Sequence, residues 1–582
     1  MFPALTRRFA ARPWARPLPV GAPTAGRVVA AVTVALAGAA AGYVLRFSVN
    51  APVVDEWDLT FPLLGGEDPW RWVFSRLNEH RYPAANAAFV VLHKLTGLDF
   101  RAGMFATVAV LTAAAVLIAA AARRVRGRAH PADVLIPAVL LHWGHQYNLL
   151  MGYQLAFGLF VLAAAVLLRV VAAAEPGAEA RTGTRAGLVL LFLMLNGGMG
   201  VAFVPPVAGW VAYLAWRVAR AGGPGARWRA AGVLLPLVPA AWYAADTLLG
   251  TPKTDALPAA TPPPGQFALA VAQYLGMGLG TWFPKVNLLA AGPAVGAAFL
   301  AAAGVLVAAV RRGDDRPRAV GLMAVLGGHL AVAVGIAAAR GGAAVDRYAT
   351  ISAVGVLAAY LALVAYGPRL SRRTGVALGL AAAAAVAAAN AGQGYRFGLI
   401  HRMYYRAFAA DLKAGMPVDF LADKYRVPFL VNERFAGNID RLRVNRVRGF
   451  AAAVPTPPLA AVPAPLPAPL TIPGCDDAGF ASAPPGVDLP PPPAGRRVAG
   501  VRVTYELPTQ LPFLELKVTW ASPPGGPRRS AGVYAPTKPG RHTVAFWLDD
   551  APAAARLVPG CPTGGLTVHA VEWLVPAESP PR

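Results

Sequence analysis

The sequence predicts a membrane-embedded, all-α bundle followed by a small β-rich domain. Hydrophobic residues make up 56% of the chain and charged residues only 14%, whereas roughly a quarter of the residues of a soluble domain are charged. Apolar runs of membrane-spanning length recur up to about residue 390. Beyond residue 473, short segments alternate apolar and polar residues between Gly/Pro turns, which is typical of β-strands.

The first apolar run, residues 27–47, follows a basic segment, residues 1–26. It is about 20 residues long and ends at Arg46 without a small-residue cleavage site, which indicates an uncleaved span rather than a signal peptide. Further runs raise the total to about eleven spans: 103–122, 132–150, 153–173, 186–198, 199–216, 230–250, 288–310, 319–339, 347–366 and 374–390.

Arginine clusters fall on alternate connections of this bundle and account for much of the net charge of +25. The positive-inside rule then places the N-terminus in the cytoplasm and the C-terminal region outside. Topology explains the basic excess, so we expect membrane lipids and no nucleic acid as partners. Residues 50–102 become an external loop with a surface helix over 82–95, and 266–283 becomes a re-entrant or interfacial segment.

The chain after the bundle is expected to lie outside the membrane in three parts. We predict a juxtamembrane region over 391–450, a Pro/Ala-rich linker over 451–472 and a β-sandwich over 473–582. Strand-like alternation covers 501–505, 514–520, 532–535, 542–548 and 567–573. Trp520 and Trp547 could bind carbohydrate, but core tryptophans are the favoured interpretation.

Both cysteines, Cys475 and Cys561, lie in this last domain. A disulfide bond between them would fit an oxidising exterior. Two unpaired buried thiols are the alternative, because sequence alone does not establish pairing.

Acidic residues gather directly after the first span, where Asp55, Glu56 and Asp58 follow one another closely. Clustered carboxylates supply a general base, or bind a divalent cation such as Mg²⁺ or Mn²⁺ through Asp55 and Asp58. The alternative is a solvated loop with incidental acids. The accompanying tryptophans and a second polar cluster favour function.

That second cluster contains Glu79, His80 and Arg81. Arg81 and His80 could hold an anion while Glu79 orients them, and an interfacial salt-bridged cap is the alternative. A third cluster comprises His142, His145, Gln146 and Asn148. We favour hydrogen bonding to a polar ligand there over metal binding by the two histidines.

Two arginines flank a Gly-Gly turn in the segment ARGGAAVDRYAT. Arg340 and Arg347, with Tyr348, either reach harmlessly to the membrane edge or grip a phosphate group. The flanking of one turn by two guanidinium groups favours phosphate binding.

The pattern over roughly residues 27–400 resembles the GT-C superfamily of membrane glycosyltransferases, which use sugars linked to polyprenyl phosphate. The resemblance lies in the many spans, the acidic motif Asp55-Glu56 with Asp58, the surface helices of the first external loop and the external domain. The D-E-W and N-E-H-R-Y-P strings are also similar to those of bacterial membrane proteins grouped with that superfamily.

The resemblance implies a protein of the bacterial cytoplasmic (inner) membrane that transfers a sugar to a glycan, lipid or protein acceptor outside. Asp55 or Glu56 would be the acidic catalytic residue. Arg81, Arg340 and Arg347 would stabilise the lipid phosphate, and the cluster from His142 to Asn148 would line the sugar or acceptor pocket. The motif is not a strict D-x-D, so a metal requirement does not follow.

A transporter or flippase of a lipid-linked or envelope polysaccharide is the competing prediction. Transporters place ionisable groups at mid-membrane and show repeated halves. The apolar runs hold few such groups, of which Asp246 is the clearest, and no repeat is evident. A non-catalytic protein that displays its external domain is a third possibility, but it would not need polar clusters on one side of the bundle.

Overall fold

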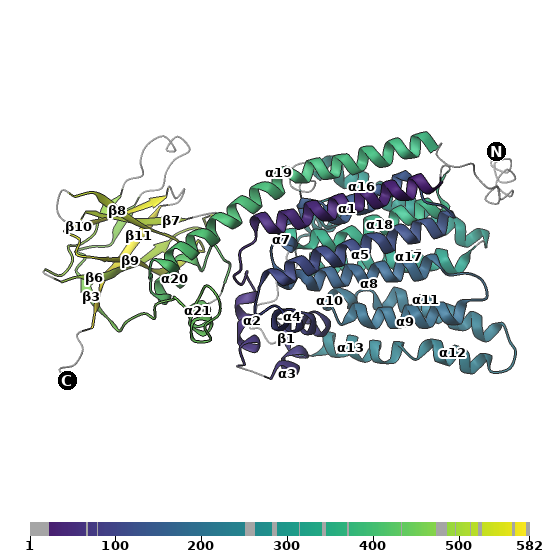
Figure 1. Cartoon of the computed structure of the whole chain (residues 1–582), viewed down its shortest axis with the longest axis horizontal. Coiled ribbons are helices and arrows are strands. Elements are labelled where there is room, and N and C mark those ends of the chain that lie inside the picture. Colours follow the sequence, from purple (N-terminus) through teal and green to yellow (C-terminus); the bar gives the residue numbers. More distant parts are fainter. Residues whose placement is uncertain are drawn as a thin grey trace. The chain divides into compact units, whose positions relative to one another are not determined.

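The computed structural model is mostly helical and has a β-sheet region near its C-terminus (Figure 1). It describes residues 22–65, 68–77, 80–250, 262–281, 288–313, 315–339, 345–368, 372–431, 433–472, 486–494, 496–511, 514–521, 526–560 and 565–577. The chain forms two compact units: a bundle unit, Met1–Ala51 with Glu67–Arg402, and a sheet unit, Pro52–Gly66 with Met403–Arg582.

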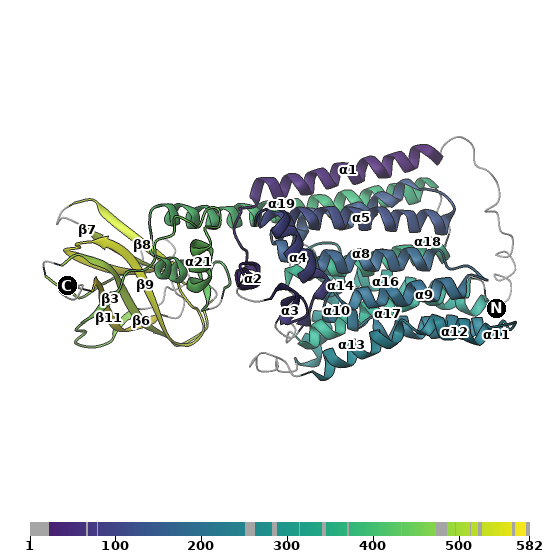
Figure 2. The ribbon, with the colours of Figure 1, turned by 60° about the horizontal axis from the view of Figure 1, so that its bottom comes forward.

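Long helices dominate the bundle unit and run alongside one another (Figure 2). They are α1 Ala22–Phe47, α5 Arg101–Arg126, α8 Leu155–Ala172, α9 Glu179–Met194, α11 Val204–Arg220, α12 Ala226–Leu234, α13 Leu237–Leu249, α14 Pro264–Met277, α16 Leu288–Arg312, α17 Arg316–Ala339, α18 Ala349–Tyr366 and α19 Arg372–Lys413. The last of these continues into the sheet unit.

Short elements connect the long helices of this unit. The α-helical ones are α3 Pro69–Val73, α4 Pro83–Leu95, α6 Leu135–Leu141, α7 Gln146–Leu149 and α10 Gly198–Val201. A hairpin consists of β1 Arg76–Leu77 and β2 His80–Arg81, and the 3₁₀ turns are η2 Pro131–Val134, η3 Trp143–His145, η4 Gly152–Gln154 and η5 Asp346–Tyr348.

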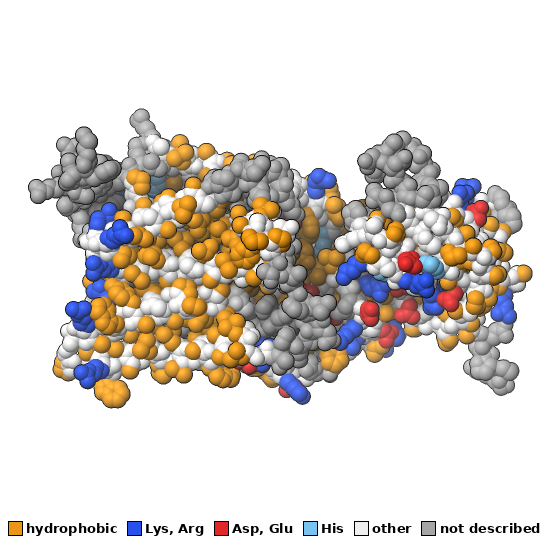
Figure 3. Space-filling view, turned by 180° about the vertical axis from the view of Figure 1, so that it is seen from behind, with side chains coloured by type: hydrophobic (Ala, Val, Ile, Leu, Met, Phe, Trp, Pro, Cys, Tyr) orange, Lys and Arg blue, Asp and Glu red, His pale blue; other side chains and the backbone are white. Residues whose placement is uncertain are grey.

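Eight helices of the described chain are long and apolar enough to cross a membrane. Large apolar side chains stay exposed on the bundle, such as Trp228, Leu249 and Leu300. Figure 3 shows an almost entirely apolar flank and a band of Lys and Arg side chains at one end of the bundle. Such a surface suits lipid contact rather than water, so the chain is a multi-pass membrane protein.

The eight candidate spans match eight of the predicted runs, and the other three differ in form. Residues 186–198 and 199–216 fall in α9 and α11, which have 16 and 17 residues. The predicted span over 132–150 is not one helix: α6 ends at Leu141, and the short elements η3, α7 and η4 follow. Because His142 and Gly144 interrupt this run, its polar side chains lie in turns.

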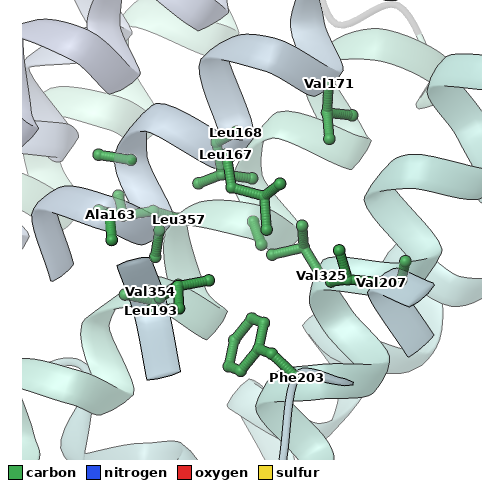
Figure 4. Packing of buried hydrophobic residues seen from close by; sticks show 14 of the residues in the cluster. Ala163, Leu167, Leu168, Val171, Leu193, Phe203, Val207, Val325, Val354 and Leu357 are labelled. Atoms are coloured by element: carbon green, nitrogen blue, oxygen red, sulfur yellow. The ribbon is translucent and has the colours of Figure 1, made fainter. Parts of the chain in front are cut away.

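The interior of the bundle is packed by branched side chains from α8, α11, α17 and α18 (Figure 4). Glycines let these helices approach closely: a Cβ on Gly321 would lie 2.7 Å from the ring of Trp210, and one on Gly328 would lie 2.7 Å from Phe203. Small residues at such contacts are typical of membrane helices. The result is a closely packed apolar interior in the bundle unit.

The sheet unit contains two antiparallel sheets with one shared core. Strand order is β5-β10-β7-β8 in one sheet and β3-β11-β6-β9 in the other, with β4 also paired to β11. The strands are β3 Leu459–Ala464, β4 Leu470–Ile472, β5 Val487–Asp488, β6 Val498–Leu507, β7 Glu515–Ala521, β8 Arg528–Tyr534, β9 Gly540–Asp550, β10 Ala554–Gly560 and β11 Leu566–Pro576. Its helices are α2 Glu56–Leu63, α20 Val418–Tyr425 and α21 Phe435–Val444.

The five strand-like segments of the sequence overlap β6, β7, β8, β9 and β11. The expected linker over 451–472 needs correction, because β3 and β4 lie within it and pair with β11. The prolines misled the prediction: β3 is the outer strand of its sheet, a position where proline is tolerated. Trp520 is a buried core residue whose indole N–H donates to Asp550, whereas Trp547 is half-buried.

Candidate functional site

The acidic motif occupies a constrained turn in the sheet unit. Val54 has a φ of 51°, a left-handed conformation that is rare for a β-branched residue and that clusters at functional sites. Asp55 follows at the start of α2, and Glu56 and Asp58 lie in the first turn of that helix. Negative charge is favourable at this end of a helix.

The three acids differ in their environment. Glu56 is fully buried, and its Oε2 accepts a hydrogen bond of 2.9 Å from the backbone N–H of Val53. Asp55 and Asp58 remain partly exposed, and Asp58 Oδ1 lies 3.4 Å from the amide nitrogen of Asn438. Glu56 therefore holds the turn together, which leaves Asp55 as the more accessible of the two predicted catalytic carboxylates.

Aromatic packing fixes α2 in place. The buried ring of Trp57 lies 4.6 Å from that of Phe435 and 5.8 Å from that of Phe450, centroid to centroid. Phe408 and Phe429 complete the surrounding cluster. The W of the D-E-W string is thus a packing residue that anchors the helix carrying the acids.

The structure also bears on the possibility of a metal centre. No group of three or more His, Cys, Asp or Glu side chains is arranged to hold a metal ion in the part of the chain that the structure describes. Binding of Mg²⁺ or Mn²⁺ through Asp55 and Asp58 stays a prediction.

Two arginines of the hairpin share a single carboxylate in the bundle unit. Arg76 and Arg81 are directly opposite each other in the β1–β2 register. Their guanidinium nitrogens lie 3.7 Å and 3.4 Å from Oδ2 of Asp246 in α13. Like charges opposite one another destabilise a hairpin, and the carboxylate offsets this. Two positive charges and one negative charge leave a net positive site.

The two arginines have different roles in this group. Arg76 donates a hydrogen bond of 2.7 Å to the backbone oxygen of Asp246 and is nearly buried, so it fastens the hairpin to the end of α13. Arg81 is about a third exposed, and its Nε has no hydrogen-bond partner among the described residues. Asp246 Oδ2 also lacks a hydrogen bond there. Arg81 is therefore the guanidinium available to an incoming anion.

The third predicted cluster forms a buried hydrogen-bond network. The hydroxyl of Thr350 lies 2.9 Å from Nδ1 of His145 and 2.5 Å from the amide nitrogen of Asn148. That amide also donates to the backbone oxygen of Arg347 at 2.7 Å. The network joins the broken segment 142–150 to the start of α18. It brings His145 and Asn148 to Thr350 and to the backbone of Arg347, whereas the predicted binding roles of these residues stay predictions.

Hydrogen-bond partners assign the protons of the two histidines. His145 Nε2 lies 2.8 Å from the carbonyl oxygen of Val139, so Nε2 carries the proton and Nδ1 accepts from Thr350. His142 Nδ1 accepts from the N–H of Gly144 at 2.9 Å, so in the neutral ring Nε2 carries the proton. The two rings stack with centroids 4.2 Å apart.

Three buried polar atoms of this segment have no hydrogen-bond partner among the described residues. They are Nε2 of His142, Oε1 of Gln146 and Oδ1 of Asn148, one donor and two acceptors. Their side chains are all at least nine-tenths buried. Buried polar atoms of this kind usually have a partner, so the segment is suited to a ligand with hydroxyl groups or to bound water.

Asn390 of α19 supports this segment and was not recognised in the sequence. Its amide nitrogen donates to the backbone oxygen of Leu279 at 2.9 Å. It fits between two glycines: a Cβ on Gly144 would lie 2.3 Å from Asn390 Oδ1, and one on Gly280 would lie 2.0 Å from the same atom. A Gly in a W-G-H string and an Asn in an alanine-rich run were the available signals.

The remaining predicted site residues have varied positions. Tyr348 is buried, with its ring 6.0 Å from that of Phe157 and the Arg347 guanidinium 5.6 Å from its centroid. The backbone of His80 lies in β2. Glu79, Arg340, Cys475 and Cys561 lie outside the described residues, as does the predicted disulfide bond.

Ionisable groups at the C-terminal end of α4 have shifted pKa values. Arg101 hydrogen-bonds Asp99 at 2.6 Å and holds the pKa of that carboxyl below its ordinary value. His93 is fully buried, and burial lowers its pKa to about 4. Its Nδ1 donates to the backbone oxygen of Phe89 at 2.8 Å, so a neutral His93 supports the packing of α4.

Comparison of the sequence with protein-family models and with curated proteins finds no match.

Proposed function

We propose that the protein is an integral-membrane glycosyltransferase that moves a sugar from a polyprenyl-phosphate donor to an acceptor outside the cytoplasmic membrane of a bacterium. The observation that carries the proposal is the set of buried atoms on His142, Gln146 and Asn148 that have no hydrogen-bond partner among the described residues. One buried donor and two buried acceptors would cost stability in an apolar interior unless a polar ligand satisfies them. Sugar hydroxyls both donate and accept hydrogen bonds and suit such a set.

Asp55 is the proposed general base. Its carboxylate takes the proton of the acceptor hydroxyl, whose oxygen attacks the anomeric carbon of the donor sugar. The bond from that carbon to the phosphate oxygen breaks, and polyprenyl phosphate leaves. Support comes from the constrained turn at Val54 and from the buried Glu56, which would position Asp55 without itself touching the substrate.

Arg81 is the proposed partner of the departing phosphate. Its partly exposed guanidinium, beside a hairpin of excess positive charge, can stabilise the negative charge that develops on the leaving group. Arg340 and Arg347 remain further candidates from the sequence. A divalent cation would serve the same purpose if Asp55 and Asp58 bind one.

The proposal includes a topology of about eleven spans, with the N-terminus in the cytoplasm and the two sheets facing each other as a sandwich outside. It rests on the arginine clusters between apolar runs and on the shared core of the sheets.

Substitution at Asp55 tests the proposal directly. Cells that express Asp55→Asn at wild-type level are expected to accumulate a polyprenyl-phosphate sugar and to lose one residue of an external glycan, with transfer falling roughly 10²–10⁴-fold. Asp440→Asn is the matched control, an acid-to-amide change on α21 whose carboxylate pairs only locally with Arg443 among the described residues. Identical glycan profiles for wild type and a folded Asp55→Asn protein would refute the proposal.

One observation favours a transporter as the second candidate. His329 lies in the middle of α17, is fully buried, and has no hydrogen-bond partner for either ring nitrogen among the described residues. The ring of Tyr274 lies 5.4 Å away, and its hydroxyl also lacks a partner there. Ionisable residues inside a membrane frequently serve proton or ion movement.

His329→Phe separates the two candidates. A transporter would lose substrate export in this variant, whereas a glycosyltransferase based on Asp55 would keep its glycan profile. Both profiles are measured in the same cells, by glycan analysis and by the distribution of the lipid-linked glycan across the membrane.

A further inference from the structure

A basic pocket opens at the ends of three helices, far along the chain from the acidic motif. It lies where α11, α16 and α17 carry their terminal arginines and has a volume of about 690 Å³. Its lining includes four arginines and two aromatic residues: Arg217, Arg220, Arg311, Arg316, Tyr213 and Trp216. Nothing in the proposed sugar transfer uses these residues.

The carboxylates that the structure describes leave much of the positive charge of this pocket uncompensated. Among the carboxylates that the structure describes, Glu179 is the only one that pairs with a lining arginine, at 3.0 Å from Arg217. Arg316 donates through Nε to the backbone oxygen of Val310, a bond that keeps its full charge. Among the described residues, one carboxylate faces four guanidinium groups, which leaves an excess of three positive charges.

The walls of the pocket suit a lipid rather than a fully soluble ion. The Trp216 side chain is 53% exposed, and the Arg220 guanidinium lies 5.2 Å from its ring centroid. Tryptophans and arginines with this arrangement are typical of the level of lipid headgroups. Along α16 and α17, away from the pocket, the apolar side chains of Leu300, Met323 and Leu330 are exposed, and acyl chains can lie against them.

We propose that this pocket binds the headgroup of an anionic phospholipid in the cytoplasmic leaflet. A guanidinium group can donate two parallel hydrogen bonds to the oxygens of one phosphate. Basic pockets between membrane helices on the cytoplasmic side are suited to phosphorylated headgroups. Three uncompensated charges favour a headgroup with two phosphates over one with a single phosphate, and both over a zwitterionic headgroup. The positive-inside rule places these arginines on the cytoplasmic side.

The test measures lipid bound to the purified full-length protein. Wild-type protein is reconstituted with equal amounts of phosphatidylcholine, phosphatidylglycerol and cardiolipin, and bound lipid is counted by native mass spectrometry. We expect cardiolipin to be retained most and phosphatidylcholine least. Arg220→Gln/Arg311→Gln is expected to lose cardiolipin at least fivefold. Equal retention of all three lipids by the wild type would overturn the proposal.

The control pair is Arg227→Gln/Arg229→Gln, which removes the same charge from exposed positions on α12 outside the pocket lining. It should retain cardiolipin as the wild type does. An equal loss in both pairs would mean non-specific attraction and would overturn the proposal. Helical circular dichroism checks that the pocket variant is folded, and Arg220→Lys/Arg311→Lys keeps the charge of the pocket. If the pocket variant loses helical signal in proportion to the lost lipid and the lysine variant does not bind cardiolipin, the proposal is also overturned.

A competition arm separates a lipid headgroup from a soluble phosphate. Inorganic pyrophosphate at millimolar concentration is added to the cardiolipin-bound protein. If the pocket is a lipid site, pyrophosphate displaces little cardiolipin, because it has no acyl chains to contact the exposed apolar side chains of α16 and α17. Full displacement of cardiolipin by pyrophosphate, together with tight pyrophosphate binding to protein reconstituted in phosphatidylcholine alone, would overturn the lipid assignment. The Asp55→Asn protein should bind cardiolipin normally, so failure of either proposal leaves the other standing.

Discussion

The hydroxyl of Thr350 and Nδ1 of His145, 205 positions apart in the sequence, lie 2.9 Å apart in the bundle interior. The same hydroxyl accepts from the amide of Asn148 at 2.5 Å. A single β-branched residue at the start of α18 thus fixes two of the predicted ligand-binding side chains. It does so from a helix whose apolar composition gives little sign of a polar role.

Thr350→Val should therefore destabilise the protein more than its small change in shape suggests. Valine keeps the volume but removes the partner of two fully buried groups, which costs about 1–3 kcal/mol for each group left unsatisfied. The measurement is the thermal unfolding midpoint of the purified protein in detergent. Thr350→Ser keeps the hydroxyl, so its unfolding midpoint should lie between those of the wild type and of Thr350→Val. A valine variant as stable as the wild type would show that the network contributes little.

Substitutions of Asp246 and of Arg81 should change the affinity for a phosphate ligand in opposite directions if their site binds one. Asp246→Asn removes the negative charge that competes with an incoming anion, so the affinity for a polyprenyl-phosphate analogue should rise, by roughly tenfold for about 1.4 kcal/mol. Arg81→Gln should lower it by a similar factor. Both affinities are measured by equilibrium binding in the Asp55→Asn background, where turnover does not interfere.

A merely structural ion pair gives a different pattern. If the contact only holds the hairpin to α13, both substitutions would weaken folding and both would lower binding. The long distance of 3.4 Å between Arg81 and Asp246, without a hydrogen bond at Oδ2, favours the first pattern.

The sequence predicted the composition of the site better than its geometry. Hydropathy located the long helices because each apolar run must reach across a bilayer, and strand alternation located β6, β7, β9 and β11. Neighbouring residues such as His142 and Asn148 could be recognised as a polar cluster. The partners contributed from elsewhere, Thr350 and Asn390, could not be assigned, because a single polar residue in an apolar helix is visible in the sequence but its contact partner is not.

The acidic motif is a second case in which the sequence identified residues but not their environment. Asp55 and Glu56 are chemically similar in the sequence, so either could be the base. Only the three-dimensional structure separates them. The Glu56 carboxylate is buried and accepts a hydrogen bond from the N–H of Val53, whereas Asp55 is partly exposed. The prolines of 451–472 similarly indicated a linker, although the backbone pairs with β11.

His93 should make the stability of the protein depend on pH. Burial lowers its pKa to about 4 from an ordinary value near 6.5. Below pH 6.5 the unfolded chain takes up a proton that the folded chain does not. The stabilising contribution is thus complete above about 6.5 and is lost as the pH falls toward 4, with a loss of about 2 kcal/mol by pH 5.

Thermal unfolding of wild type and His93→Gln between pH 7.5 and 4.5 measures this contribution. Glutamine retains a donor for the carbonyl oxygen of Phe89 but does not titrate. Other groups titrate in both proteins, so the difference between the two curves isolates His93. Parallel curves over this range would contradict the assignment of a buried neutral imidazole.

Gly144 and Asn390 should show strong energetic coupling. A methyl group on Gly144 would lie 2.3 Å from Oδ1 and 2.7 Å from Cγ of Asn390, well inside van der Waals contact. Asn390 is fully buried and anchored to the backbone of Leu279, so it has little room to withdraw. Gly144→Ala alone should therefore destabilise the bundle by about 1–3 kcal/mol, the usual cost of overpacking a core.

The double variant Gly144→Ala/Asn390→Ala tests the origin of that cost. Shortening Asn390 removes its Oδ1 and Cγ from the path of the new methyl group, whereas Cε1 of His142, at 2.7 Å, remains. The second substitution should therefore recover only part of the loss caused by the first. The coupling free energy from the four unfolding midpoints should be of the order of 1–2 kcal/mol, as for residues in direct contact. Gly209→Ala on α11 is the control, because its new methyl group would meet no atom within 4 Å. Additive effects of Gly144→Ala and Asn390→Ala would show that the two residues do not restrain each other, and that close packing of α19 does not support the polar segment.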